Sequence, residues 1–268
     1  MGSSQTFALI GGALFLSTAG QALAADIPSV PPPVVIGGAW YLRGDIGMTN
    51  QSVDSLFNVL DATTTSLVTV SKEFDSSPFV GFGIGYKYSD HVRFDVTGEY
   101  RGGANFHGLQ IYNGGVAPVG GTDEYTGVKT EWTFLANAYW DLGTWRGITP
   151  FLGAGIGASY NTIGGFTDVN TPNLGVAYGA TASTMNLAWA LYAGLGYQVT
   201  PNLTIEAAYR YIDLGNAQSG DLIASNGVNA IYNPEEFHHL TSQDIKVGFR
   251  WAFGGSSQQS YYPPVVKY

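Results

Sequence analysis

Acidic and basic side chains recur at every second position in several short stretches of this sequence. The residues concerned are Arg43, Asp45, Arg93, Asp95, Glu99, Arg101, Lys129, Glu131, Glu206, Arg210, Asp244, Lys246 and Arg250. Residues two apart point to the same face of a β-strand, so acids and bases are expected to share one face. Because an unpaired charge away from bulk water is costly, the spacing predicts a paired charge network.

The stretch 241–253 shows what lies on the two faces of such a strand. One face carries the uncharged side chains of Gln243, Ile245, Val247, Phe249, Trp251 and Phe253. The other carries Ser242, Asp244, Lys246, Gly248, Arg250 and Ala252. Lipid outside and a polar lumen inside would explain both faces.

Histidine and tyrosine are the candidates for ligand chemistry, since both can bind haem iron. The candidates are His107, His238 and His239, with Tyr112, Tyr125 and Tyr232 near them in sequence. Adjacent residues of a strand point to opposite faces, so His238 and His239 cannot share a metal without a bend. Histidines without a ligand are the favoured interpretation, and no cofactor is expected.

Enzymatic chemistry has weak support in the sequence. Nucleophilic catalysis needs a base within hydrogen-bond reach of its nucleophile. His239 shares its face with Thr241 and Gln243, whereas Ser242 falls on the opposite face beside Asp244. The glycine-rich segment 153–157 has no helix pattern after it, as a phosphate-binding loop would require. We therefore predict a protein that is not an enzyme and has no nucleic-acid partner.

Eight segments alternate apolar and polar residues and are predicted as strands. They are residues 39–48, 79–88, 92–101, 129–141, 150–160, 185–199, 203–211 and 240–253. Short turns separate the second from the third, the fourth from the fifth and the sixth from the seventh segment. The other four connections, 49–78, 102–128, 161–184 and 212–239, are long and rich in Gly, Asn, Ser and Thr. This alternation of connections is typical of bacterial outer-membrane barrels.

The predicted fold is all-β: an eight-stranded antiparallel up-and-down transmembrane β-barrel with four long extracellular loops and short periplasmic turns. A soluble barrel would show the same alternation turned inside out. Aromatic residues at both ends of the strands, long connections on one side only and the final strand favour the membrane barrel. No run of about 18 apolar residues follows residue 25, which excludes a helical span.

The sequence at the two ends of the chain predicts a signal peptide, a linker and a tail outside the barrel. Residues 1–24 have a short apolar core and end in Ala22, Leu23 and Ala24, as a secretory signal peptide does. Residues 25–38 are predicted as a proline-rich linker, residues 39–253 as the barrel and residues 254–268 as a periplasmic tail. With no cysteine in the chain, stability must come from the sheet itself.

Several segments resemble a known family. They include 41–47, 150–157, 195–203 and 209–211, which together resemble the OmpA-like and opacity-protein-like eight-stranded outer-membrane proteins, of the major surface antigen type in alphaproteobacteria. In that family a signal in the last strand is recognised by the barrel assembly machinery, and Lys246, Gly248, Trp251 and Phe253 match it. The resemblance implies a Gram-negative outer membrane as location, with lipid, lipopolysaccharide and the assembly machinery as partners.

The expected function is structural: a porin-family barrel that stabilises the outer membrane and presents surface antigen. The predicted loops and their margins are acidic, with Asp54, Asp61, Glu73, Asp75, Asp123, Glu124, Asp168, Asp213, Asp221, Glu235 and Glu236 against Lys72 alone. A solvated acidic surface is the simplest explanation, and cations shared with lipopolysaccharide are the alternative. Other functions left open are a narrow cation-biased channel, haemin capture and host-surface binding. An oligomer or a periplasmic partner also stays open.

Overall fold

The computed structural model describes residues 39–61, 67–114, 119–172, 174–229 and 231–253. The predicted signal peptide, proline-rich linker and C-terminal tail lie outside these residues. The described strands are β1 (Ala39–Phe57), β2 (Leu67–Phe74), β3 (Ser77–Lys87), β4 (Val92–Tyr112), β5 (Thr122–Asp141), β6 (Ile148–Asn170), β7 (Gly175–Gly179), β8 (Ala182–Gln198), β9 (Leu203–Gln218), β10 (Leu222–Ala224) and β11 (Glu236–Phe253). Within these ranges no helix is long and apolar enough to cross a membrane.

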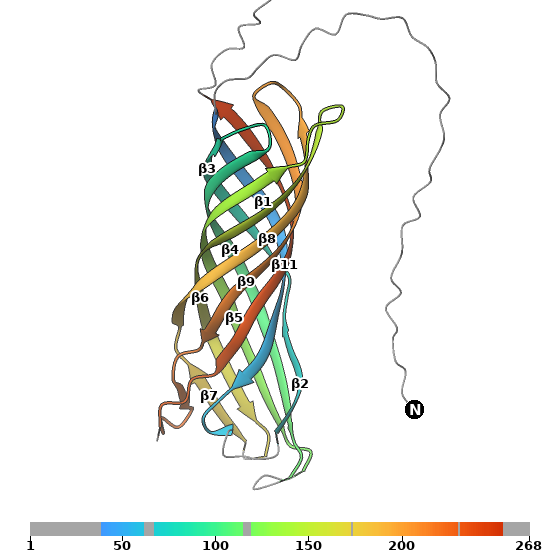
Figure 1. The fold of residues 1–268 in the computed structure, drawn as a ribbon. Coiled ribbons are helices and arrows are strands. Elements are labelled where there is room, and N and C mark those ends of the chain that lie inside the picture. The colour runs from blue at the N-terminus through green and yellow to red at the C-terminus, as the bar shows by residue number, and fades with distance from the viewer. Residues whose placement is uncertain (1–38, 62–66, 115–118, 173, 230, 254–268) are drawn as a thin grey trace, which may run out of the picture. The chain divides into compact units, whose positions relative to one another are not determined.

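The strands close into the predicted eight-membered antiparallel ring. Its order is β1, β3, β4, β5, β6, β8, β9 and β11, and β11 pairs with β1 from Trp40–Phe253 to Phe57–Glu236. Figure 1 shows the closure, where the blue β1 and the red β11 lie side by side. Closure leaves no unpaired strand edge in the ring, which is what a bilayer requires of a β-structure.

The outward-facing side chains near the short turns are apolar. Exposed members of this apolar band include Trp40, Leu42, Ile46, Met48, Phe82, Phe94, Val96, Phe134, Trp140, Leu152, Ile156, Leu191, Leu195, Val247, Phe249, Trp251 and Phe253. On β1 the band runs from Trp40 to Met48, after which Asn50, Ser52 and Asp54 face outward. A tilted strand needs about nine to eleven residues to cross a bilayer. The band is therefore the membrane-spanning part of each strand.

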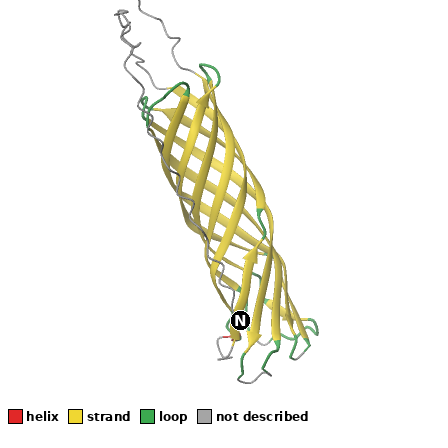
Figure 2. Cartoon of the chain, turned by 90° about the vertical axis from the view of Figure 1, so that its right-hand side faces the viewer, coloured by secondary structure: helices red, strands yellow, loops and turns green. Residues whose placement is uncertain are grey.

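Strands make up at least half of each of the four long connections, and this corrects the predicted organisation. β1 continues to Phe57, β4 to Tyr112 and β9 to Gln218, while β5 already begins at Thr122. β2 continues the line of β3 by pairing with β4, and β7 continues that of β8 by pairing with β6. We call the described parts of 49–78, 102–128, 161–184 and 212–239 the head. Figure 2 shows that strands make up most of it.

β-Bulges explain why these strand extensions look like loops in the sequence. Between Arg101 and Ala104 the register of β4 against β5 shifts, and Gly102 and Gly103 occupy the bulge. Before it, odd-numbered residues of β4 face inward; after it, even-numbered residues do. On β6 the register against β5 shifts between Gly164, which pairs with Val128, and Thr167, and Gly165 in this bulge has a φ of 59°. An extra residue in one strand reverses which side chains face inward, so the alternation loses its phase there.

Part of the interior of the head is an apolar layer, which the membrane-spanning part lacks. Phe74, Phe106, Phe166 and Phe237 point inward and are buried, and the ring of Phe106 lies 4.8 Å from that of Phe237 and 4.9 Å from that of Phe74. Phe166 lies 5.9 Å from Phe237 and 6.0 Å from Tyr125. These five rings form an aromatic cluster. It gives the head a hydrophobic core of its own.

Candidate functional site

The barrel interior gathers the charged residues that the sequence places on one face. Arg43, Asp45, Arg93, Asp95, Glu99, Arg101, Lys129, Glu131, Glu206, Arg210, Asp244 and Lys246 are buried, and the side chain of Arg250 is 14% exposed. They come from β1, β4, β5, β9 and β11. Strand alternation alone directs them inward, because each lies an even number of residues from its neighbours along an unbulged stretch.

Ion pairs nearer the short turns centre on Arg43 and Glu206. The Arg43 guanidinium donates to Asp95 Oδ2 at 2.7 Å and to both carboxylate oxygens of Asp45 at 2.9 Å. Glu206 lies 3.2 Å from Arg93 Nη2, 3.1 Å from Arg250 Nε and 3.7 Å from Arg43 Nη2. One carboxylate thus serves three guanidinium groups, each from a different strand.

A second group of ion pairs lies nearer the head and centres on Asp244. Its Oδ2 accepts hydrogen bonds from Arg210 Nε at 2.8 Å and from Arg101 Nη2, and its Oδ1 accepts from Ser242 Oγ at 2.5 Å. Arg210 Nη1 also pairs with Glu99 at 2.7 Å. Glu131 lies 2.9 Å from Arg101 Nε and pairs with Lys129.

Lys246 joins the two groups into one network. Its ammonium lies 3.4 Å from Asp45 and 3.6 Å from Glu99. Every charged residue named above, together with Asp141 on Arg93, belongs to this network. Lys87, which strand parity places on the same face, lies outside it and pairs with the exposed Asp90 at 3.1 Å. Charge therefore balances inside the barrel, with an acid beside every base.

Aromatic rings and glycines fit around the network. The Arg93 guanidinium carbon lies 4.0 Å from the centre of the Tyr139 ring and 4.7 Å from that of Phe151, within the range of cation–π attraction. A Cβ on Gly81 would lie 2.6 Å from the Glu99 side chain, and one on Gly83 would lie 3.1 Å from that of Arg43. Glycine on β3 thus leaves the space that long charged side chains from β1 and β4 occupy.

The far end of the head holds a cavity of about 410 Å³ with an acidic lining. Asp61, Asp123 and Asp168 line it together with Tyr112 and Asn170. Tyr112 donates a hydrogen bond to Asp123 Oδ2 at 3.1 Å, and Asn170 donates to the same oxygen at 3.4 Å. The other carboxylate oxygen, Oδ1, of Asp123 and the Oδ1 of Asp168 accept no hydrogen bond from an N–H group among the described residues.

Burial changes the proton affinity of these head carboxyls. Loss of hydration and a hydrogen bond to Asp123 raise the pKa of Asp168 to about 9. Burial likewise raises the pKa of Glu235, behind the cavity, to about 8, and that of Asp61 to about 6. The sequence suggested a solvated acidic surface here. This expectation is wrong for Glu235, because its side chain is completely buried.

The candidate haem ligands do not come together. His107 is exposed on the outside of β4, whereas Tyr112 and Tyr125 are buried inside the head and Tyr232 is exposed. His238 pairs with Glu236 at 3.0 Å. His239 occupies a bulge of β11 with a φ of 55° and pairs with Asp213 at 3.0 Å. Among the described residues no three His, Cys, Asp or Glu side chains are placed to hold a metal ion.

Residues of the expected assembly signal fall on both faces of β11. Lys246 points into the charge network, and Gly248 lies where a Cβ would be 2.5 Å from the carbonyl oxygen of Gly44. Trp251 and Phe253 are exposed in the apolar band. The matching positions thus combine an interior lysine, a close backbone approach and two outward aromatic rings.

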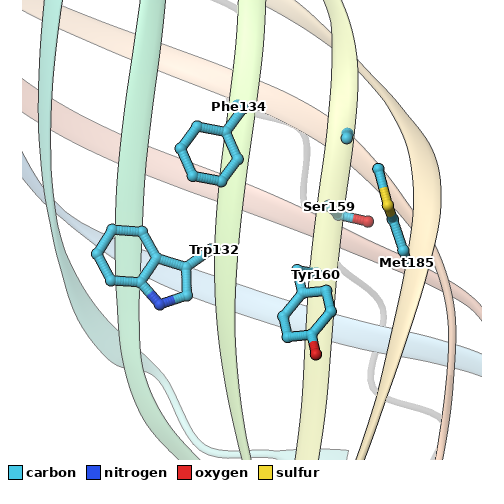
Figure 3. A pocket seen from close by; sticks show the side chains of 6 residues that line it. Trp132, Phe134, Ser159, Tyr160 and Met185 are labelled. Atoms are coloured by element: carbon cyan, nitrogen blue, oxygen red, sulfur yellow. The ribbon is translucent and has the colours of Figure 1, made fainter.

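A groove on the outer face lies at the head-side edge of the apolar band. Trp132, Phe134, Tyr160 and Met185 line it, and Figure 3 shows their side chains on neighbouring strands β5, β6 and β8. Apart from Ser159, whose hydroxyl donates to Leu214 O at 2.6 Å, the lining is apolar or aromatic. Aromatic side chains at this level are typical of the interface of a transmembrane barrel.

Comparison with known proteins shows the family to which the chain belongs. The family model for the outer membrane protein beta-barrel domain matches residues 11–253, so the chain belongs to this family. Its location is the bacterial outer membrane. The crystal structures of Neisserial surface protein A and of OprG from Pseudomonas aeruginosa each cover 81% of this chain, and 100% and 96% of their own chains. Their identities are 16% and 15%, and their TM-scores are 0.44 and 0.46.

Curated relatives cover about two thirds of the chain or more. An uncharacterized protein of Brucella suis biovar 1 is 31% identical over 211 residues, which are 72% of this chain and 74% of that protein. The outer membrane protein PagN of Salmonella typhimurium is 28% identical over 182 residues, 65% and 72% of the two chains. A protein named as a candidate adhesin in Rickettsia bellii is 30% identical over 188 residues, 69% and 76% of the two chains.

Proposed function

We propose that this protein is a structural barrel that is closed to solutes and holds a β-structured head outside the membrane as surface antigen. The continuous charge network is the observation that carries the proposal. Eight strands give an interior just wide enough for side chains, and here ion pairs link β1, β4, β5, β9 and β11 across it. The aromatic cluster in the head adds an apolar layer on the same path.

The same layers argue against the narrow cation-biased channel. An ion crossing the barrel would have to separate pairs such as Arg210–Glu99 and Arg43–Asp95, which are 2.7 Å long and buried. Breaking a buried pair costs about 3–5 kcal/mol. It would then meet the four phenylalanine rings of the aromatic cluster, which offer no polar ligand. Closure is thus built into two successive layers of different chemistry.

Single-channel recording tests this proposal. The folded protein, purified in detergent and placed in a planar bilayer under a salt gradient, should give no reproducible conductance steps. Heat-dependent gel mobility confirms folding of the same sample. Reproducible cation-selective steps from folded protein would reject the closed barrel and establish transport.

Host-surface binding is a second candidate, and a specific feature favours it. The strands continue beyond the apolar band into a head with its own aromatic cluster, so the head forms a rigid surface for contact. A relative of similar length is named as a candidate adhesin. Non-adherent bacteria that display this chain should bind host cells more than bacteria that carry an empty vector, and soluble competition by folded protein should remove the difference. Equal binding of the two strains would reject adhesion.

We infer that the protein is not an enzyme. The Ser242 hydroxyl donates to Asp244 inside the charge network, and His239 pairs with Asp213 on the exposed side of β11. The only serine next to the histidine pair along β11 is therefore committed to an ion-pair network and is inaccessible to a substrate. We also propose that four residues of β11 act as the assembly signal, namely Lys246, Gly248, Trp251 and Phe253. Replacement of the two aromatic residues by alanine should reduce insertion into the outer membrane.

A further inference from the structure

The described lining of the acidic cavity in the head contains no basic residue. Asp61, Asp123 and Asp168 line it, and the buried Glu235 lies behind it. Lys72 is the one base in the four connections that form the head, and its ammonium donates to the backbone oxygen of Asp54. Lys129, below the head, is already paired with Glu131 and Gln51. A buried group of carboxyls without a base must bind protons or a cation.

A second observation points into the cavity itself. Asp123 is 3% exposed, and although its Oδ2 accepts from Tyr112 and Asn170, its Oδ1 accepts no hydrogen bond from an N–H group of the described residues. The Oδ1 of Asp168, another lining residue, also receives no N–H group, and the Asp168 carboxyl is hydrogen-bonded to that of Asp123. When the proton between the two carboxyls leaves, both Oδ1 atoms are acceptors that a ligand with N–H groups would stabilise.

The size and lining of the cavity distinguish between kinds of cation. Ca²⁺ takes six to eight oxygen ligands at short distances, and no group of three acidic or histidine side chains among the described residues is placed to hold a metal ion. The volume of about 410 Å³ is in the range of small-molecule sites. Apolar residues Val176, Leu222 and Ile231 also line it, which suits an aliphatic chain.

We propose that this cavity binds a protonated aliphatic amine, with the ammonium between Asp123 and Asp168 and the methylene chain along the apolar lining. The ligand class is a small diamine or polyamine. Its ammonium supplies the N–H donors that the two Oδ1 atoms lack. The apolar part of the lining selects an amine with a carbon chain over an inorganic cation.

Protons compete with the amine for this site. The titratable groups that face the two aspartates are Asp61, Glu235, Tyr112 and Tyr125, with Glu236 next to Glu235 along the chain. Because Asp168 holds a proton at neutral pH, the amine must displace it. Binding should therefore release a proton and tighten as the pH rises from 6 to 9, while the amine itself stays charged.

Isothermal titration of 1,5-diaminopentane into the folded, detergent-solubilised full chain tests the proposal. Titrations in two buffers of different ionisation enthalpy should show proton release. Asp123→Asn and Asp168→Asn should each weaken binding at least tenfold, equivalent to about 1.4 kcal/mol. Glu124→Gln is the matched control, because it removes one negative charge from the adjacent residue of β5 that faces outward. It should change the affinity by less than about threefold.

Several results would overturn the proposal. Absence of saturable heat at millimolar diamine with folded protein would exclude the site. Equal weakening by Glu124→Gln and Asp123→Asn would show general attraction to an acidic surface. Calcium chloride that binds with the same dependence on Asp123 and Asp168 would identify an inorganic cation site. A short lysine peptide that binds while the diamine does not would identify a polypeptide partner. Folding of each variant is checked by heat-dependent mobility, and two aspartate variants are used so that loss of one to misfolding leaves the other.

Discussion

Replacement of Asp244 by asparagine should destabilise the barrel more than any single change at an exposed ion pair. Asp244 accepts hydrogen bonds from Arg210 Nε at 2.8 Å, from Ser242 Oγ at 2.5 Å and from Arg101. Asparagine keeps the size and one acceptor oxygen but removes the negative charge that two fully buried guanidinium groups share. Removing one partner from a buried ion pair costs about 3–5 kcal/mol, because the remaining charge is left without compensation.

Asp90→Asn is the control for this prediction. The Lys87–Asp90 pair has a similar length of 3.1 Å, but its side chains are 43% and 71% exposed. An exposed pair of this kind contributes about 0–1 kcal/mol. Asp244→Asn should therefore lower the urea midpoint of unfolding by more than about 1 M, and Asp90→Asn should lower it only slightly. Urea unfolding in lipid vesicles, followed by tryptophan fluorescence, measures both midpoints.

A particular outcome would refute the reasoning. If Asp244→Asn and Asp90→Asn shift the midpoint equally, the barrel interior screens charge as well as bulk water does. The buried pairs would then add little to stability, and the argument that they resist separation by a passing ion would fail. The closed-barrel proposal would have to rest on the aromatic cluster alone.

Three further results are expected from the same geometry. Gly157→Ala should prevent folding, because its Cβ would overlap the carbonyl oxygen of Phe134 and lie 2.9 Å from Leu135 Cα in the backbone of β5, whereas Gly98→Ala should fold, since its Cβ would meet only a side chain at 3.3 Å; heat-dependent gel mobility distinguishes them. Phe237→Ala should cost about 3–5 kcal/mol in head stability, while the exposed Phe57→Ala should cost far less, as measured by hydrogen exchange of the head strands. Head stability should fall as the pH rises from about 5 to 8. With a folded pKa of about 8, Glu235 keeps a proton in this range that the unfolded chain has released. The free energy of unfolding therefore falls by about 1.4 kcal/mol per pH unit for each such proton. Limited proteolysis across this range should show the loss, and Glu235→Gln should flatten the profile.

The charge network could be located from the sequence because it depends only on strand parity. Between two bulges, a residue and the one two places further along always share a face, so Arg93, Asp95 and Arg101 could be assigned to the interior without knowing their partners. The partners themselves could not be assigned. Arg43 pairs with Asp95 and Lys246 with Glu99 because closure of the ring brings β1, β4 and β11 together. The stagger between strands cannot be inferred from the sequence of any single strand.

The head is the part that only the tertiary structure decided. At Gly102 and Gly103 an extra residue reverses which side chains face inward, so Phe106 points into the barrel although Phe94 and Val96, at the same parity, point to lipid. A sequence pattern that changes phase at a glycine pair looks like the beginning of a loop. Sequence alone thus determined the membrane-spanning ring and its polar interior, through a period of two. The aromatic cluster and the acidic cavity depended on where that period shifts and on which strands then meet.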